Sequence, residues 1–182
     1  MDKEKYKKVM FLDMDGPLCP PRISMAMGDR GIYTALDIPA LTFINNLLRE
    51  DPFLGLVISS SWRVGRDTDF FYHVFGALGL RYLKSRLCED WKTKVLGLKR
   101  GEEVEEWLGR HPEIENYVIL DDDSDFLENQ KDKLVLADPR DGLLFKHFIQ
   151  IRDILYPKIQ ECEDPTGCKS IILRLEDLKE DP

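Results

Sequence analysis

The 182-residue sequence has no long hydrophobic run and no excess of positive charge. None of its apolar segments approaches the ~20 residues that a membrane-spanning helix needs. The N-terminal residues MDKEKYKK are charged, whereas a secretory signal peptide carries a long apolar segment. The formal net charge of −8 excludes a uniformly basic coat for nucleic acid. We therefore expect a cytoplasmic protein that does not enter a membrane and does not bind long polynucleotides tightly.

The sequence is also poor in residues that form disulfide scaffolds or zinc sites. Its four cysteines are Cys19, Cys88, Cys162 and Cys168. Its three histidines are His73, His111 and His147. No two cysteines form a CxxC pair, and no histidine lies at zinc-like spacing from them. Since no export signal is found, we expect reduced thiols, although Cys162 and Cys168 share a loop in which they can come into contact.

Apolar strands alternate with helices along the chain. The expected strands span residues 8–13, 54–61, 82–87, 116–123 and 133–139. The expected helices span residues 37–51, 67–79, 100–113 and 143–159. The first, second and fourth of these strands are nearly continuous apolar runs, which is typical of a parallel sheet covered on both faces.

The same pattern predicts one α/β domain over residues 1–156. Residues 17–36 contain prolines and glycines without a helical pattern, so we expect an irregular loop or small flap there. Residues 157–182 form a C-terminal extension, in which residues 170–178 are expected to add a strand or a helix.

Polar residues follow three of the apolar strands. Asp13 and Asp15 follow the first strand, the sequence SSSWR at residues 59–63 follows the second, and four aspartates at positions 121, 122, 123 and 125 follow another. Ligands of open α/β sheets bind beyond the carboxyl ends of the strands, so these groups converge if the strands are neighbours. Carboxylates from two strands suit Mg²⁺, and the hydroxyls and cations suit a phosphate.

Four motifs carry a family resemblance. FLDMDG, VISSSWR, a lysine ahead of a helix and VILDDDSD occur in the order seen in the haloacid dehalogenase superfamily of phosphotransferases. Over residues 8–150 the chain resembles the branch found in RNA-repair proteins and the phosphatase domain of phage polynucleotide kinase. The resemblance implies a Rossmann-like three-layer sandwich around a central parallel sheet, with a minimal cap domain or none.

The resemblance also implies a role for each acidic residue. Asp13 is expected to be the nucleophile that forms an aspartyl-phosphate. Asp15 is expected to act as general acid and then as general base. Asp13, the backbone carbonyl of Asp15, Asp121 and Asp122 would bind Mg²⁺, and Asp125 would orient a water molecule there. Gly16 would allow a sharp reversal of the chain close to the substrate.

Two roles stay open between neighbouring residues. Ser60 is the first candidate for the hydroxyl that binds phosphate, because it fits a hydroxyl-x-Trp pattern. Its neighbour Ser61 is the alternative, because it fits a Ser-x-Arg pattern. Lys99 is the first candidate for the active-site cation, because it immediately precedes a helix; Lys94 and Arg100 are the alternatives.

Two further side chains of the SSSWR segment have competing interpretations. Arg63 either contacts the substrate phosphate or pairs with an aspartate. Trp62 either packs beneath the site or stacks on a base.

These expectations describe a magnesium-dependent phosphomonoesterase that works through an aspartyl-phosphate. The segment between the first two strands is too short for a full cap domain, and an open site admits the end of a polymer. The substrate hypothesis is therefore a terminal phosphate of RNA or DNA, such as a 3′-phosphate. The alternatives are a phosphatase of nucleotides or small metabolites, a mutase, and a catalytically silent binding module, against which the intact Asp13 and Asp15 argue.

Overall fold

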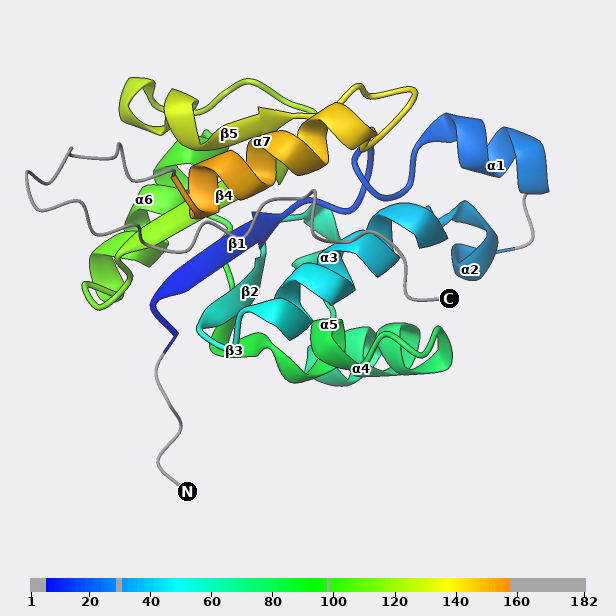
Figure 1. Cartoon of the computed structure of the whole chain (residues 1–182), viewed down its shortest axis with the longest axis horizontal. Helices are drawn as coiled ribbons and strands as arrows, with labels where there is room; N and C mark the ends of the chain where they lie inside the picture. The colour runs from blue at the N-terminus through cyan, green and yellow to red at the C-terminus, as the bar shows by residue number, and fades with distance from the viewer. Residues whose placement is uncertain (1–5, 29–30, 98, 158–182) are drawn as a thin grey trace, which may run out of the picture.

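A five-stranded parallel sheet forms the centre of the computed structural model, which describes residues 6–28, 31–97 and 99–157 (Figure 1). The strands are β1 (Lys8–Leu12), β2 (Leu54–Ile58), β3 (Leu87–Lys92), β4 (Asn116–Asp121) and β5 (Leu134–Leu136). Their order in the sheet is β3-β2-β1-β4-β5, with all neighbours parallel. The predicted parallel sheet is confirmed. The strand or helix predicted at residues 170–178 and the loop predicted to hold Cys162 and Cys168 lie outside the described residues.

The central strand β1 is paired in register with strands on both sides. Leu12 at its end lies opposite Ile58 of β2 and Leu120 of β4. Because the three strands are parallel and end at the same level, the residues that follow them emerge at one edge of the sheet.

Helices cover both faces of the sheet and complete a Rossmann-like, three-layer arrangement. One core joins Met10 and Leu12 of β1 to the helices α3 (Ile38–Glu50), α4 (Thr68–Ala77), α5 (Arg81–Ser85) and α7 (Phe145–Leu155). The other core joins Val9 and Phe11 to α6 (Arg100–Arg110). Successive side chains of a strand point to opposite faces, which explains why a continuous apolar run supplies both cores.

The prediction of a strand at residues 82–87 is wrong. Most of this segment forms the short helix α5, and Asn45 of α3 accepts hydrogen bonds from the backbone N–H groups of Tyr82 and Leu83 at 2.9 and 3.3 Å. These N–H groups lie in the first turn, where a helix has no partners of its own for them. The strand β3 comes directly afterwards and lies at the edge of the sheet.

The loop expected at residues 17–36 contains two short helices, α1 (Pro21–Met27) and α2 (Ile32–Ala35). Pro21 occupies the first helical position of α1, where its fixed φ and missing N–H favour a helix start. Neither helix buries a residue completely, and both lie beyond the carboxyl end of β1 (Figure 1). The segment therefore flanks the edge where β1 ends and does not form a separate layer.

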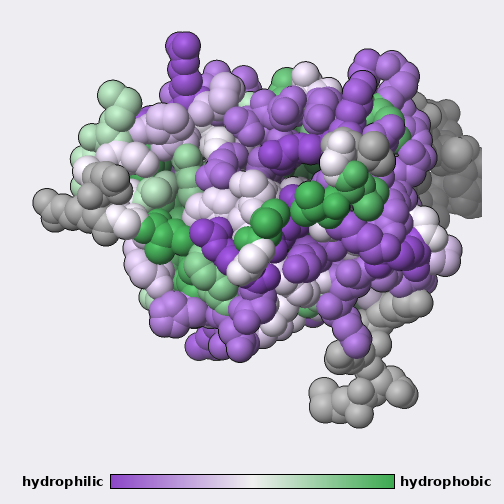
Figure 2. All heavy atoms as spheres, turned by 180° about the vertical axis from the view of Figure 1, so that it is seen from behind, coloured by the Kyte–Doolittle hydropathy of each residue, from purple (hydrophilic) through white to green (hydrophobic). Residues whose placement is uncertain are grey.

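The outer surface on the α6 side is largely hydrophilic. Figure 2 shows the molecule from behind, where hydrophilic residues cover most of the face and hydrophobic ones form a band across the middle and a region at the left. In the part of the chain that the structure describes, no helix has the length and apolar character required to span a membrane.

Candidate active site

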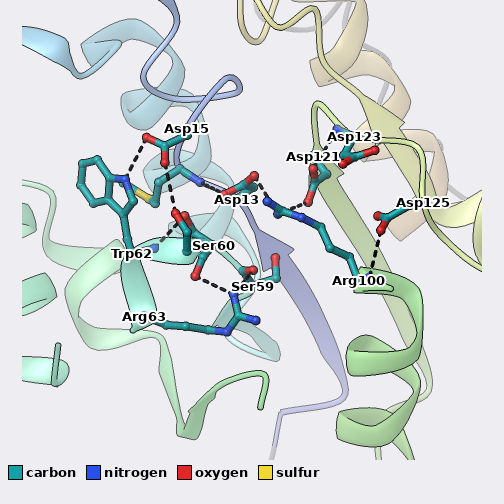
Figure 3. Close-up of polar contacts among 12 residues, drawn as sticks. Asp13, Asp15, Ser59, Ser60, Trp62, Arg63, Arg100, Asp121, Asp123 and Asp125 are labelled. Carbon is teal, nitrogen blue, oxygen red and sulfur yellow. Dashed lines mark hydrogen bonds and ion pairs between the residues drawn. The ribbon is translucent and has the colours of Figure 1, made fainter. Parts of the chain in front are cut away.

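The candidate site lies at the carboxyl edge of the three central strands (Figure 3). Asp13 follows β1, and its backbone N–H donates to the carbonyl of Leu120 at 2.9 Å. The N–H of Ser59 donates in the same way to the carbonyl of Leu12 at 3.1 Å. Asp121 is the last residue of β4. The sheet hydrogen bonds thus continue into the site and place its residues on rigid backbone.

Three carboxylates meet at this edge. Asp13, Asp121 and Asp122 each offer an oxygen, and these oxygens lie within 4.8 Å of one another. Asp13 and Asp121 are almost completely buried. Burial, followed by the charge of Asp13, raises the pKa of Asp121 to about 7. The same two causes raise the pKa of Asp122. A divalent cation would relieve this repulsion, and clustered carboxylate oxygens are the ligands that such ions prefer.

Gly16 makes room for one of these carboxylates. Its φ of +76° lies in the left-handed region, and a Cβ atom there would stand 2.3 Å from Cγ of Asp122. Such a distance is far inside van der Waals contact, so no larger residue fits unless Asp122 moves. Gly16 was expected near the substrate, and the structure shows it packed against an acidic residue of the cluster.

Arg100 is the cation that the structure places among the carboxylates. Its Nη1 donates to Oδ2 of Asp13 at 2.8 Å and to Oδ2 of Asp121 at 2.7 Å. Its backbone N–H faces Oδ2 of Asp125 at 3.4 Å, which ties Asp125 to the start of α6 (Figure 3).

The structure does not bring Lys99, the first candidate for this cation, to the carboxylates. Lys99 is the exposed N-cap residue of α6, whereas Arg100 is the first helical residue and turns toward the sheet. Lys94, the other alternative, pairs with Glu106 on the surface.

Asp15 points away from the carboxylate cluster and is held by the SSSWR segment. Its Oδ1 accepts the indole N–H of Trp62 at 2.9 Å, and its Oδ2 accepts the hydroxyl of Ser61 at 3.2 Å. Asp13 instead faces Arg100 (Figure 3). The two aspartates of the first motif therefore occupy different surroundings, which suits two different chemical roles.

Ser60 and Ser61 differ in the same way. Ser60 is fully buried, and its Oγ accepts the backbone N–H of Trp62 at 3.3 Å as the N-cap of a 3₁₀ turn, η1 (Ser61–Arg63). In that contact Oγ is the acceptor, so its hydroxyl hydrogen can be donated to an anion. The hydroxyl of Ser61 is directed to Asp15. This geometry favours Ser60 as the phosphate ligand.

Arg63 supports the site and does not face the substrate side. It is 6% exposed. Its Nε donates to the carbonyl of Thr93 at 2.9 Å, and Nη1 donates to the carbonyls of Ser59 and Ser60 at 2.5 and 2.7 Å. Its Nη2 pairs with Oε2 of Glu103 at 2.5 Å. The expected substrate contact is therefore replaced by a buried bracing role, with a glutamate of α6 as the partner in place of an aspartate.

The sequence reasoning missed Glu103, although a signal was present. Glu103 lies four residues before Trp107, which places both on one face of α6. A charged residue on the buried face of a helix requires a partner, and Arg63 is that partner.

Comparison with known proteins places these residues in a family. A family model described as the HAD domain in Swiss Army Knife RNA repair proteins matches residues 9–148. The searches among curated proteins and among solved structures give no match to the chain. The matched residues include β2, β4 and all of β1 except Lys8, together with every site residue described above. The resemblance to the RNA-repair branch, expected from the four motifs, is confirmed.

Proposed function

Because the chain belongs to the family of HAD domains in Swiss Army Knife RNA repair proteins, we propose that it is a magnesium-dependent phosphomonoesterase that forms an aspartyl-phosphate. The family itself indicates a hydrolase of the phosphatase type. The observation that carries the finer proposal is the separation of two carboxylate environments. Asp13 lies with Asp121, Asp122 and Arg100, whereas Asp15 lies with hydrogen-bond donors on the opposite side.

Asp13, Asp121 and Asp122 are the residues that would hold the magnesium ion. Their oxygens are close enough to share one cation. Burial and the charge of Asp13 raise the pKa values of Asp121 and Asp122, and a bound cation would favour their ionised forms. When bound, Mg²⁺ neutralises charge between the nucleophile and the phosphate, which lets two anions approach each other. We also propose the backbone carbonyl of Asp15 as a ligand of the magnesium ion.

Asp13 would attack phosphorus, and Asp15 would act first as the general acid and then as the general base. An oxygen of Asp13 bonds to phosphorus as the bond to the ester oxygen breaks, and the electron pair leaves with that oxygen. Asp15 donates a proton to the leaving oxygen, which departs as an alcohol. Asp15 then takes a proton from water as the water attacks phosphorus. This second step breaks the bond to Asp13 and releases inorganic phosphate.

Ser60 and Arg100 would orient the phosphoryl group. The hydroxyl of Ser60 is positioned by a buried turn and retains a hydrogen to donate. The guanidinium of Arg100 contacts the nucleophile directly. Fixed donors and fixed positive charge act strongly where charge develops, because they need no reorganisation during the reaction.

A nucleic-acid end is the substrate class that we propose. The family is one of RNA repair, and the segment between β1 and β2 adds only the small helices α1 and α2 ahead of α3. Arg66 lies beside Trp62, which contacts Asp15; its guanidinium carbon is 5.1 Å from the ring of Trp62 and 4.4 Å from that of Phe70. A cation held beside the site suits a substrate that carries further phosphates.

The test compares phosphate release from 3′-phosphorylated oligonucleotides, 5′-phosphorylated oligonucleotides, mononucleotides and p-nitrophenyl phosphate. We expect Mg²⁺-dependent release that favours the 3′-phosphorylated oligonucleotide and disappears in Asp13→Asn. Good cleavage of mononucleotides with failure on both oligonucleotides would support a nucleotide phosphatase instead. Transfer of labelled phosphate to a sugar in place of water would support a mutase. Failure on every ester would support a binding module.

A further inference from the structure

The Asp15 carboxylate is an exposed group that two neighbouring side chains hold in place. The indole N–H of Trp62 donates to Oδ1 at 2.9 Å, and the hydroxyl of Ser61 donates to Oδ2 at 3.2 Å. Both donors come from η1, at the end of a different strand from the one that carries Asp15. An exposed aspartate on a turn would otherwise exchange between rotamers, so these bonds decide where its oxygens point.

Trp62 is itself fixed by contacts that do not involve Asp15. Its backbone N–H donates to Oγ of Ser60, and its ring packs edge-on against Phe70 with centroids 6.2 Å apart. The guanidinium of Arg66 covers part of the ring. The next residue, Arg63, anchors the turn in the interior. The indole N–H is therefore a prepositioned donor, and such support is what holds a catalytic group in productive geometry.

We propose that Trp62 is a positioning residue that directs the catalytic proton of Asp15 to Oδ2 and thereby enables cleavage of esters with alcohol leaving groups. An indole N–H only donates, so Oδ1 stays an acceptor in both protonation states of Asp15. A hydroxyl both donates and accepts, so Ser61 adapts when Oδ2 carries a proton. This inference rests on the proposed function, in which Asp15 is the general acid.

The proton balance follows from that arrangement. As Asp13 bonds to phosphorus, the bond from phosphorus to the ester oxygen breaks, and the proton moves from Oδ2 of Asp15 to that oxygen. The products of this half-reaction are a free alcohol, phosphorylated Asp13 and ionised Asp15. In the second half-reaction Oδ2 recovers a proton from the attacking water. A ribose hydroxyl is a poor leaving group and needs this proton, whereas p-nitrophenolate leaves without it.

The decisive variant is Trp62→Phe, which keeps an aromatic ring and removes the N–H donor together with part of the indole ring. We expect kcat/KM for a nucleoside 3′-phosphate to fall on the order of 10- to 100-fold, the scale of a misplaced catalytic group. For p-nitrophenyl phosphate we expect kcat/KM to change by less than about 3-fold, because kcat/KM reports the first half-reaction, in which p-nitrophenolate leaves without the proton of Asp15. An equal loss on both esters would overturn the proposal, since a purely structural role predicts it.

A matched control is Trp107→Phe, which removes an indole hydrogen bond of the same length, 2.9 Å, to the carbonyl of Asp90 away from the site. It should leave the ratio of the two kcat/KM values unchanged. The double variant Asp15→Asn with Trp62→Phe should be no slower on the nucleoside phosphate than Asp15→Asn alone, because one residue acts through the other. A further loss in the double variant would contradict the proposal.

The wild-type protein separates this inference from the function on which it rests. Hydrolysis of both esters by wild type, with equal losses in Trp62→Phe, would refute the role of Trp62 and leave the phosphatase proposal standing. If wild type hydrolysed neither ester, both proposals would fall.

Discussion

Replacing Gly16 with alanine should damage the proposed metal site more than the fold. The φ of +76° at this position costs a residue with a Cβ about 1–2 kcal/mol. For a domain of this size, 1 kcal/mol corresponds to roughly 2–4 °C, so the melting temperature should fall by about 2–8 °C. The added Cβ would also lie 2.3 Å from Cγ of Asp122, against 3.4 Å at the near limit of ordinary contact. Asp122 must therefore shift by about 1 Å.

A shift of that size removes Asp122 from a magnesium site. Mg²⁺ requires near-ideal octahedral geometry with ligands about 2.0–2.1 Å away, so the Mg²⁺ dissociation constant should rise at least about 10-fold. At a Mg²⁺ concentration 100 times the wild-type dissociation constant, bound metal stabilises the wild-type fold by about 2.7 kcal/mol. With a 10-fold higher dissociation constant, Mg²⁺ at the same concentration stabilises the fold by only about 1.4 kcal/mol.

Gly79→Ala is the control, because Gly79 has a positive φ like Gly16 but no neighbouring atom that an added Cβ would meet. Its φ is +72°, and a Cβ there meets no atom within 4 Å. Gly79→Ala should therefore lower the melting temperature by a similar amount and keep the full stabilisation by Mg²⁺. Thermal unfolding of both variants with EDTA and with Mg²⁺ separates the two effects. Equal stabilisation by Mg²⁺ in the two variants would refute the assignment of Asp122 as a ligand.

Three further predictions concern charge. In the metal-free protein, the pKa of Asp121 lies at about 7, against 3.8 when unfolded. The folded state therefore binds the extra proton, and stability should fall by up to about 4 kcal/mol as the pH rises through this window. Thermal melts in EDTA should show this slope between about pH 4 and 7 and a plateau above about pH 7, and Asp121→Asn should flatten the slope. Glu103→Ala breaks a buried ion pair and should cost about 3–5 kcal/mol in urea unfolding, whereas Glu106→Ala on the exposed side of α6 should cost at most about 1 kcal/mol. Arg66→Gln should lower kcat/KM for 3′-phosphorylated oligonucleotides and reduce its salt slope by about 0.7; Lys84→Gln, which removes another exposed cation that lies over a ring, should change neither.

The parts of the fold that could be predicted are those in which local pattern and tertiary packing agree. The runs before Asp13 and Asp121 are buried on both faces, so they appear as continuous apolar stretches with acidic residues at their ends. Asp37 caps α3 as its side chain and position suggest, accepting the N–H of Ala40 at 3.2 Å. Convergence of the site then follows, since parallel strands of one sheet end at one edge.

The edge strand β3 could not be predicted in the same way. Its sequence LCEDWK contains three charged residues, and only Leu87 is fully buried. An edge strand has one neighbour and a partly exposed face, so its apolar signal is weak. The preceding residues have no strong pattern either, and hydrogen bonds from the backbone N–H groups of Tyr82 and Leu83 to Oδ1 of Asn45 favour a helix there. Local propensity is easily overridden in such segments.

The choice between Lys99 and Arg100 depends on how α6 docks. Neighbouring residues at a helix start point in different directions, so the sequence alone leaves both available. The packing of α6 at Gly101 makes this choice between Lys99 and Arg100. A Cβ at Gly101 would stand 2.6 Å from the backbone nitrogen of Leu127, so the start of the helix lies very close to that loop. This close approach is reinforced by Gln130, whose Nε2 donates to the carbonyl of Gly101 at 2.9 Å. With α6 pressed onto this loop, Arg100 is the residue that faces the sheet.

The charges at the site explain why a guanidinium and a divalent cation can both belong there. Asp13, Asp121 and Asp122 supply three negative charges when ionised, and Arg100 supplies one positive charge, which leaves a formal charge of −2. Burial and the charge of Asp13 raise the pKa of Asp121, so a proton on this residue offsets part of the excess in the metal-free protein. Once Asp121 has released that proton, a divalent ion would balance the full formal charge of −2. Metal binding and proton release should therefore be linked, with Mg²⁺ binding more tightly as the pH rises through about 7.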